Sequence, residues 1–259
     1  MFDVENPTLK TRLVEGPPLG VFWFALGSLP LIEAALAAGA EAVVIDMQHG
    51  LFSRQDLEGA VGVVPAHVPC LVRVEDHTPA AIGRALDAGA EGVIVPLIET
   101  AEQASAVAAA CHYPPIGHRS GGGVRPLRNF GPYRKAADRA ITVGVMIETA
   151  TGVANAAGIA AAEYVDFVFI GTGDLALSLG GSLDVTDAHE TACREILEAC
   201  ENAGKPCGLF TGDAASAARR LGEGYAMSVV ANDISATYDA FGAASKRFRA
   251  GRADASWTE

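Results

Sequence analysis

Basic residues are scarce in this sequence of 259 residues. It has 19 lysines and arginines against 31 aspartates and glutamates, which gives a formal net charge of -12. Proteins that bind nucleic acids contact phosphates with clustered lysine and arginine side chains, so this composition argues against a nucleic-acid partner. The protein as a whole would also repel an anionic small molecule. Binding such a molecule would therefore require a local arginine or a bound cation.

Cysteine pairs and long apolar runs are also missing. The five cysteines are odd in number and include no CxxC motif, which favours reduced, buried thiols over a disulfide framework. No basic segment followed by an apolar one opens the chain, and glycine or aspartate interrupts the apolar runs well short of the roughly 18 residues of a membrane span. We therefore expect a cytoplasmic protein with neither a signal peptide nor a membrane partner.

The sequence does contain a regular alternation of short apolar segments and segments with helical periodicity. Residues 20–26 have the pattern of a strand, and the alanine-rich segment 31–38 ends at Gly39, a residue type favoured after a helix. The other predicted strands cover 42–47, 71–75, 92–98, 142–148, 167–171, 206–211 and 226–230. The other predicted helices cover 54–64, 80–88, 101–111, 132–139, 153–162, 187–202, 214–221 and 234–248.

Eight strand-helix pairs predict an α/β fold, a single-domain (β/α)8 TIM barrel that spans residues 1–259. Residues 1–19 form a leading segment with a short helix near Arg12, and residues 250–259 form a polar, frayed tail. The irregular insert 113–129 is typical of a functional or mobile loop. A doubly wound open sheet is the alternative, but no glycine-rich phosphate motif follows the first strand.

In a parallel barrel, the carboxyl ends of all strands meet at one rim, where such enzymes place their chemistry. Carboxylates are the commonest side chains at the predicted strand ends. Asp213 and Asp233 begin predicted helices, and we interpret them as N-caps. The remaining candidates at this rim are Trp23, Asp46 with His49, Arg73 with Glu75, Pro96 with Glu99, Glu148, Asp174, Thr211 and Asn232.

Glu148 and Asp174 each directly terminate one of two neighbouring apolar strands, with no lysine nearby to neutralise them. Two carboxylates at short range repel each other unless a cation lies between them. Oxygen ligands suit Mg²⁺ or Mn²⁺ rather than structural zinc. We therefore predict a divalent metal site here; the alternative is a pair of independently solvated or capped acids.

Arg73 ends the third predicted strand, where a buried arginine is expected to meet an anion or to form an ion pair with Glu75 or Asp46. His49 follows the second strand and is a candidate general base or a plain loop residue. His189 and Cys193 have helical i, i+4 spacing in a predicted outer helix, and we interpret this spacing as accidental rather than as a metal site.

The four lysines are also informative by their positions, because none ends a predicted strand; they are Lys10, Lys135, Lys205 and Lys246. An aldolase that forms a Schiff base would need a lysine at the rim. If the chain acts on carbon–carbon bonds beside a carbonyl, a metal ion must stabilise the enolate instead.

Several spaced motifs resemble those of the metal-dependent class II pyruvate aldolases, typified by 4-hydroxy-2-oxoheptanedioate aldolase and 2-keto-3-deoxy-L-rhamnonate aldolase. The resemblance covers nearly the whole chain. The matching residues are Trp23, Glu33, Ile45-Asp46-x-x-His49, Arg73, Leu86-Asp87-Ala88-Gly89-Ala90, Val95-Pro96, Thr100-Ala101-Glu102, Tyr113-Pro114-Pro115-x-Gly117-x-Arg119, Ile147-Glu148-Thr149 and Phe169-Ile170-Gly171-x-x-Asp174-Leu175.

The resemblance implies a role for each matching residue. Glu148 and Asp174 correspond to the ligands of a divalent metal (Mg²⁺, Mn²⁺ or Co²⁺), which a pyruvate-type substrate chelates. Arg73 corresponds to the arginine that stabilises the enolate. His49 corresponds to the histidine that moves a proton through water, paired with the acid that matches Asp87.

The resemblance also implies a substrate-binding loop and an oligomer. The backbone amides around Gly171, Thr172 and Gly173 correspond to the loop that holds the substrate carboxylate. Trp23 and Gln48 adjoin the substrate, and Asp46 supports the catalytic group. Family members are commonly hexamers with an exchanged C-terminal helix, so we expect a homo-oligomer, a hexamer or a trimer, in which Asp87 acts near a neighbouring subunit's site.

Three positions depart from the family pattern. Many members have Glu where this chain has Gln48, Gln where it has Met146, and Pro where it has Thr172. The expected function is reversible cleavage of a 2-keto-4-hydroxy acid to pyruvate or hydroxypyruvate and an aldehyde. The alternatives are a decarboxylase of an oxaloacetate-like acid and a keto-acid-binding barrel without turnover.

Overall fold

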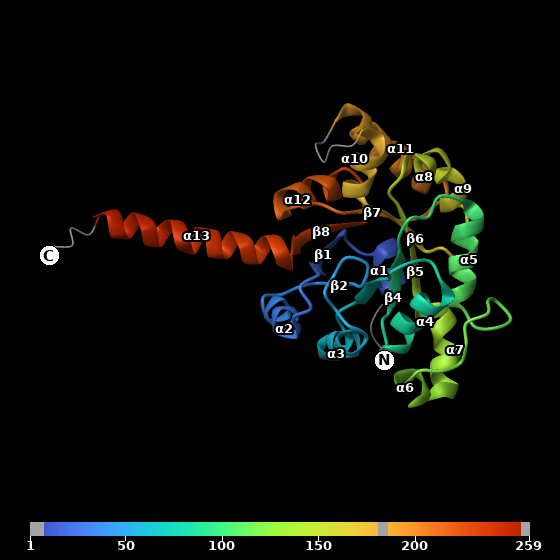
Figure 1. Ribbon diagram of the computed structural model, residues 1–259. Helices are drawn as coiled ribbons and strands as arrows, with labels where there is room; N and C mark the ends of the chain where they lie inside the picture. The colour runs from blue at the N-terminus through green and yellow to red at the C-terminus, as the bar shows by residue number, and fades with distance from the viewer. Residues whose placement is uncertain (1–7, 181–185, 255–259) are drawn as a thin grey trace.

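The eight strands form one closed parallel barrel, with neighbours in the order of the sequence. A computed structural model describes residues 8–180 and 186–254 (Figure 1). The barrel closes because β8 pairs with β1, for example Val229 with Val21. The predicted (β/α)8 TIM barrel is thus confirmed, and the open doubly wound sheet is excluded.

The strands are short and almost completely buried. One face of each strand lies against the barrel interior and the other against the outer helices, so apolar β-branched residues are favoured on both faces. The strands are β1 (Leu19–Phe24), β2 (Val43–Asp46), β3 (Cys70–Arg73), β4 (Gly92–Val95), β5 (Thr142–Ile147), β6 (Phe167–Ile170), β7 (Cys207–Leu209) and β8 (Met227–Asn232).

Helices surround the barrel, and local sequence sets where several of them begin. Ser53 and Thr100 each form a capping box with the residue three positions later. The helices are α1 (Leu9–Glu15), α2 (Leu29–Ala37), α3 (Arg54–Val63), α4 (Pro79–Asp87), α5 (Ala101–Cys111), α6 (Val124–Leu127), α7 (Phe130–Ala140), α8 (Ala150–Ala154), α9 (Ala156–Ala160), α10 (Thr172–Gly180), α11 (Asp187–Asn202), α12 (Ala214–Gly222) and α13 (Asp233–Asp254).

The structure corrects the sequence prediction in four places. The insert 113–129 contains a short helix, α6, and the predicted helix 153–162 is divided at Asn155 into α8 and α9. Helix α10 was not predicted, because its glycine-rich start obscures the helical pattern. Residues 250–254 continue α13 instead of forming a frayed tail. The remainder of the predicted tail, 255–259, and residues 1–7 of the leading segment lie outside the described residues.

Two apolar clusters form the core, one inside the barrel and one between the strands and the outer helices. The inner cluster includes Trp23, Met146 and Phe169, with Leu9 and Leu13 of α1 also buried in it. The backbone amide of Leu9 donates to Glu91, immediately before β4, at 2.6 Å. Helix α1 therefore closes the amino end of the barrel and leaves the opposite rim for ligands.

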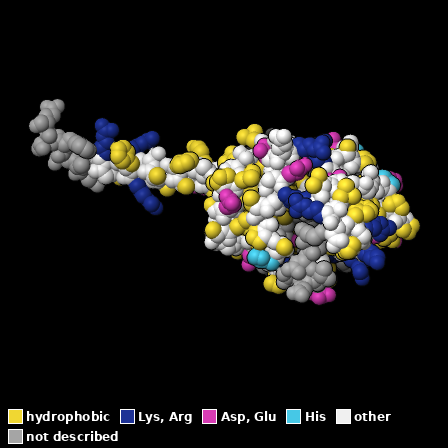
Figure 2. All heavy atoms as spheres, turned by 90° about the horizontal axis from the view of Figure 1, so that it is seen from below, with side chains coloured by type: hydrophobic (Ala, Val, Ile, Leu, Met, Phe, Trp, Pro, Cys, Tyr) yellow, Lys and Arg dark blue, Asp and Glu magenta, His cyan; other side chains and the backbone are white. Residues whose placement is uncertain are grey.

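Helix α13 extends away from the barrel as a single rod (Figure 1). Four large apolar side chains on it are exposed, and apolar and basic side chains are visible along the projecting helix in Figure 2. They are Ile234, Tyr238, Phe241 and Phe248. No helix in the described ranges is both long and apolar enough to cross a lipid bilayer.

Candidate active site

The alternation of side chains along each strand brings the candidate residues into the barrel. Each of three polar residues lies two positions after a member of the inner cluster, so both point to the same side of the strand. The pairs are Val44 and Asp46, Leu71 and Arg73, and Met146 and Glu148. These residues end, or directly follow, β2, β3 and β5, so the three polar side chains converge at the carboxyl rim.

Asp46 is the most highly connected of these side chains. Its Oδ1 accepts hydrogen bonds from Arg73 Nε at 2.9 Å and from the amides of Gln48 and His49 at 3.0 and 3.2 Å. Its Oδ2 accepts from Arg73 Nη2 and from Trp23 Nε1 at 3.3 Å. Burial opposes ionisation, but Arg73, the His49 amide and the Trp23 indole together hold the pKa of Asp46 below its ordinary value. Asp46 is therefore a buried carboxylate that fixes its neighbours.

The loop after β2 depends on a glycine. A Cβ atom at Gly50 would lie 2.0 Å from the carbonyl oxygen of Asp46, a distance that no side chain tolerates. The absence of a side chain lets the chain fold back tightly over Asp46. This turn places the amides of Gln48 and His49 on the carboxylate and leaves the His49 side chain exposed at the rim.

Arg73 is held between Asp46 and an aromatic wall. Its guanidinium carbon lies 5.0 Å from the centre of the Trp23 ring, in cation–π contact. Trp23 itself stacks on Phe169 at 5.7 Å and meets the edge of Phe210 at 5.4 Å. Of the two partners predicted for Arg73, the structure shows Asp46, whereas Glu75 pairs with Arg84. Two of the five guanidinium N–H groups contact Asp46, which leaves others for a ligand.

Glu148 has one satisfied and one unsatisfied carboxylate oxygen. Oε1 accepts a hydrogen bond from the amide of Leu97 at 2.8 Å, whereas buried Oε2 has no partner among the described residues. Leu97 adopts a left-handed conformation with φ +57°, which is unfavourable for a residue with a side chain. The strain is consistent with a backbone that is held to aim its amide at Glu148.

The electrostatic environment of Glu148 disfavours its charged form. Burial raises the pKa of Glu148 to about 7, and the neighbouring carboxylate of Asp174 adds to the shift. The Leu97 amide and the charge of Arg73 oppose the shift only in part. Asp174 is thus an electrostatic neighbour of Glu148, and no basic side chain bonds to the free oxygen of Glu148 among the described residues.

Asp174 does not end a strand, in contrast to the prediction. It lies in the first turn of α10, after β6 has ended at Ile170. Gly171 makes this approach to Glu148 feasible, because a Cβ atom there would lie 2.3 Å from Glu148 Oε2 and 2.8 Å from Glu148 Cβ. The position of Asp174 is thus set by a helix start packed against the end of β5.

The first turn of α10 also presents backbone amides toward the rim. The amide of Gly171 is already used, since it donates to the carbonyl of Ile147 at 3.1 Å. Thr172 and Gly173 occupy the first helical positions, where N–H groups have no acceptor within the helix. Of the three residues predicted to hold a substrate carboxylate, these two are the ones with amides in position to donate, while Gly171 provides space.

Comparison with known proteins identifies the family. The model of the HpcH/HpaI aldolase/citrate lyase family matches residues 20–240. The chain belongs to this family. It is 36% identical over 213 residues to a 4-hydroxy-2-oxovalerate aldolase of Novosphingobium aromaticivorans, covering 80% of each chain. It is 35% identical over 241 residues to a hydroxypyruvate/pyruvate aldolase of Paraburkholderia phytofirmans, covering 88% of this chain and 92% of the relative.

A solved structure gives the same result. A HpcH/HpaI aldolase/citrate lyase family protein from Burkholderia cenocepacia J2315 superposes with a TM-score of 0.88 at 35% identity, over 93% of this chain and 98% of that protein. The chain is therefore a lyase of the HpcH/HpaI family, and the resemblance to class II pyruvate aldolases inferred from its motifs is confirmed.

One residue of the predicted active site lies elsewhere in the subunit. Asp87 ends α4, shortly before the start of β4, and so lies toward the amino end of the barrel. It forms an ion pair with Arg119 Nη2 at 3.2 Å beside an outer groove of about 490 Å³. Within one chain, the structure does not bring Asp87 to the rim that carries Glu148, Asp174 and Arg73.

Arg119 is a residue whose importance was missed in the sequence. It is almost fully buried, donates to the hydroxyl of Tyr133 at 3.1 Å, and lies over the ring of Tyr113 at 4.8 Å. Gly123, with φ +83°, lets the insert approach Asp87, because a Cβ there would lie 2.7 Å from Asp87 Cβ. The irregular insert 113–129 therefore fixes Asp87, and the available signal was the family motif Tyr113-Pro114-Pro115-x-Gly117-x-Arg119 within it.

Leu97 was missed for a different reason, because its contribution is a backbone amide that any residue type carries.

The interpretations of the two helix-start acids, Asp213 and Asp233, were partly correct. Asp213 caps α12 by accepting from the amides of Ala215 and Ser216. Asp233 instead accepts from the amides of Ala25 and Leu26 at 2.9 and 2.8 Å and so ties the end of β1 to α13.

Proposed function

We propose that this protein is a divalent-metal-dependent aldolase that reversibly cleaves a 2-keto-4-hydroxy acid to pyruvate or hydroxypyruvate and an aldehyde. The observation that carries the proposal is the pair Glu148 and Asp174 at the rim, with one buried carboxylate oxygen of Glu148 lacking a partner in the described part of the chain. The names of the relatives, which include 4-hydroxy-2-oxovalerate aldolase and hydroxypyruvate/pyruvate aldolase, support this substrate class.

The residues at the rim fit a hard divalent cation. A buried acid with raised pKa and an unpaired oxygen is costly to ionise unless positive charge is supplied. Two carboxylates with water and substrate oxygens suit Mg²⁺, Mn²⁺ or Co²⁺, because Mg²⁺ is commonly held by one or two carboxylates. When bound, the cation would act as a Lewis acid toward the keto group.

Arg73 would stabilise the negative charge that develops on the keto oxygen as the bond between C3 and C4 breaks. Its bonds to Asp46 and its contact with Trp23 hold the guanidinium in one orientation before the substrate arrives. Such preorganised donors act in a site from which water is largely excluded and are a major source of catalysis. The amides of Thr172 and Gly173 would bind the substrate carboxylate at the start of α10.

His49 would move the proton. In the cleavage direction, the 4-hydroxyl loses its proton as C4 becomes the carbonyl of the aldehyde, and C3 is later protonated to give the methyl group of pyruvate. The imidazole of His49 is exposed at the rim and is carried by a loop fixed on Asp46. Asp87 would assist from a neighbouring subunit, which agrees with its distance from the rim of its own chain.

We also propose that the protein forms a homo-oligomer, a hexamer or trimer, through α13. This helix projects from the barrel with Tyr238 and Phe241 more than two-thirds exposed, at 79% and 70%. Large apolar patches on a projecting helix favour burial against another subunit. The five free, buried thiols support a cytoplasmic location, since that compartment is reducing.

The test is an aldol assay with purified protein, pyruvate or hydroxypyruvate, and a panel of aldehydes, with products identified by mass. Activity should disappear on chelation, return with Mg²⁺, Mn²⁺ or Co²⁺, and be lost in Glu148→Gln. Activity that survives both chelation and this substitution would contradict the metal mechanism. Release of carbon dioxide from oxaloacetate, without aldehyde chemistry, would instead identify a decarboxylase.

A further inference from the structure

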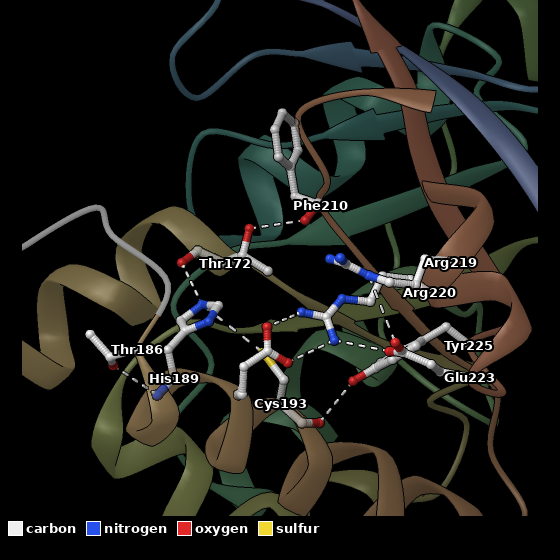
Figure 3. A network of polar contacts seen from close by, with 10 residues as sticks. Thr172, Thr186, His189, Cys193, Phe210, Arg219, Arg220, Glu223 and Tyr225 are labelled. Atoms are coloured by element: carbon white, nitrogen blue, oxygen red, sulfur yellow. Dashed lines mark hydrogen bonds and ion pairs between the residues drawn. The ribbon is translucent and has the colours of Figure 1, made fainter. Parts of the chain in front are cut away.

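The pair His189 and Cys193 is part of a polar network that reaches the start of α10. Figure 3 shows the His189 ring of α11 between the backbone carbonyl of Thr172 and the thiol of Cys193. His189 Nε2 lies 3.0 Å from the Thr172 oxygen and 4.0 Å from Cys193 Sγ. Because a carbonyl can only accept, Nε2 carries the proton in this contact. His189 and Cys193 therefore do not form a metal site, but their i, i+4 spacing brings them into one network with Thr172.

Thr172 is held from two further directions. Its hydroxyl donates to the carbonyl of Phe210, directly after β7, at 2.9 Å (Figure 3). The preceding amide, that of Gly171, donates to Ile147 on β5. The start of α10 is thus tied to β5, to the end of β7 and to α11. Asp174 is only two residues further along this turn.

The helix that carries His189 is itself anchored. Thr186 caps α11 by accepting from the His189 amide at 3.2 Å. The buried Arg220 of α12 donates to Glu190 at 2.8 Å, and the hydroxyl of Tyr225 donates to the carbonyl of Cys193 at 3.2 Å. These contacts hold the turn of α11 that carries the imidazole. His189 therefore links the start of α10 to a rigid part of the outer layer.

We propose that His189 is a positioning residue for the metal site, which acts through Thr172 to set Asp174 opposite Glu148. The side chain is 3% exposed and points at the backbone, so it contacts neither the substrate nor the two carboxylates. A loose start of α10 would let Asp174 move away from Glu148, because Asp174 follows Thr172 by two residues in the same helical turn and like charges repel each other. This inference rests on the proposed metal-dependent function.

The expected effect is a weaker metal site in a folded protein. Removing a group that bonds directly to a metal ligand typically changes metal affinity by about 10- to 100-fold, and His189 acts one step further out, through the backbone of Thr172. His189→Leu should therefore weaken Mn²⁺ binding by about 10-fold, at the lower end of this range. His189→Gln, whose side-chain amide can donate to the same carbonyl, should restore most of the affinity.

A matched control exists in the same chain. His112 is also a buried histidine, and its Nδ1 contacts the carbonyl of Ala108 at 2.8 Å, at the end of α5 and away from the rim. His112→Leu should lower the melting temperature to a similar extent as His189→Leu, but it should leave Mn²⁺ affinity unchanged. This comparison separates a loss of positioning from a general loss of stability.

The experiment measures Mn²⁺ affinity by electron paramagnetic resonance titration, and hydrogen exchange of the 172–176 segment without metal. In His189→Leu, Mn²⁺ binding should weaken and the segment should exchange faster. At saturating Mn²⁺, the kcat of His189→Leu should return toward the wild-type value, whereas its KM for the keto acid should return less. Wild-type Mn²⁺ affinity and wild-type exchange in His189→Leu would overturn the inference, as would an equal loss of affinity in His112→Leu.

Two further outcomes are covered. If His189→Leu does not fold, His189→Phe keeps a planar ring without a donor for the Thr172 carbonyl, with His189→Gln again as the variant that can donate. Unchanged Mn²⁺ affinity in His189→Phe would then overturn the inference. If the wild-type protein binds no Mn²⁺, the proposed function fails, while hydrogen exchange still decides whether His189 holds the start of α10.

Discussion

Replacing Gly171 with alanine tests the geometry of the candidate metal site most directly. The new Cβ would lie 2.3 Å from Glu148 Oε2, 2.8 Å from Glu148 Cβ and 3.1 Å from Met146 Sδ. The carboxylate oxygen would have to withdraw by about 1 Å to reach ordinary contact. Glu148 Cβ cannot rotate away, because it is bonded directly to the backbone, so β5 or the start of α10 must also shift.

The size of the effect follows from this overlap. Overpacking a buried site typically costs about 1–3 kcal/mol of folding free energy, which a stable barrel should survive. A displacement of about 1 Å at a reacting group can cost about 100-fold in rate. We therefore expect Gly171→Ala to fold, to bind Mn²⁺ about 10- to 100-fold more weakly, and to lose about 100-fold in kcat/KM.

Calorimetric or resonance titration with Mn²⁺ and steady-state kinetics provide the measurements. Gly173→Ala is the matched control for metal binding, because a Cβ at that glycine meets no described atom within 4 Å. A Gly171→Ala protein that binds Mn²⁺ as tightly as the wild type and keeps its activity would refute the argument that Glu148 occupies this space when it functions. If Gly173→Ala weakened Mn²⁺ binding as much as Gly171→Ala, the close approach of residue 171 to Glu148 could not be the cause.

Three further predictions concern the same chain. Because burial raises the pKa of Glu148 from its ordinary 4.5 to about 7, the folded, metal-free protein keeps a proton that the unfolded chain releases between these values. Its free energy of unfolding should thus fall, by on the order of 3 kcal/mol, as pH rises through this range, and urea titrations of Glu148→Gln should not show this fall. Asp46→Ala leaves Arg73 buried without its carboxylate and should cost about 3–5 kcal/mol in urea unfolding, against less than about 1 kcal/mol for Glu75→Ala, which removes the more exposed pair with Arg84. Tyr238→Ser combined with Phe241→Ser should shift the protein to a smaller species in sedimentation velocity, and an unchanged sedimentation coefficient would argue against assembly through α13.

The fold could be predicted because its signals are local. Short apolar segments followed by helical periods recur eight times, some of them closed by a glycine such as Gly39 or Gly89, and they leave few alternatives to a barrel. The errors also have local causes. Helix α6 is only four residues long, too short to show a period, and α10 starts with Thr172 and Gly173, residues that do not suggest a helix.

The candidate site was predictable in composition and less so in geometry. The parity of each strand fixed which side of it Asp46, Arg73 and Glu148 face, and the rim of a parallel barrel brought them together. The sequence left two possible ion-pair partners for Arg73, Asp46 and Glu75. Only the pairing of β2 with β3, which sets Asp46 beside Arg73, selects Asp46.

The sequence by itself determined the class of fold, the two carboxylates after neighbouring strands as candidates and the absence of a lysine at the rim, because residue identity and spacing carry that information. Only the tertiary structure decided where Asp174 lies, that the Leu97 amide serves Glu148, that Asp87 is held by Arg119 away from its own rim, and that His189 supports the start of α10. The physical reason is that these features depend on backbone groups and on contacts between distant segments. Such contacts leave no periodic trace in the chain, and they exist only once the barrel has closed.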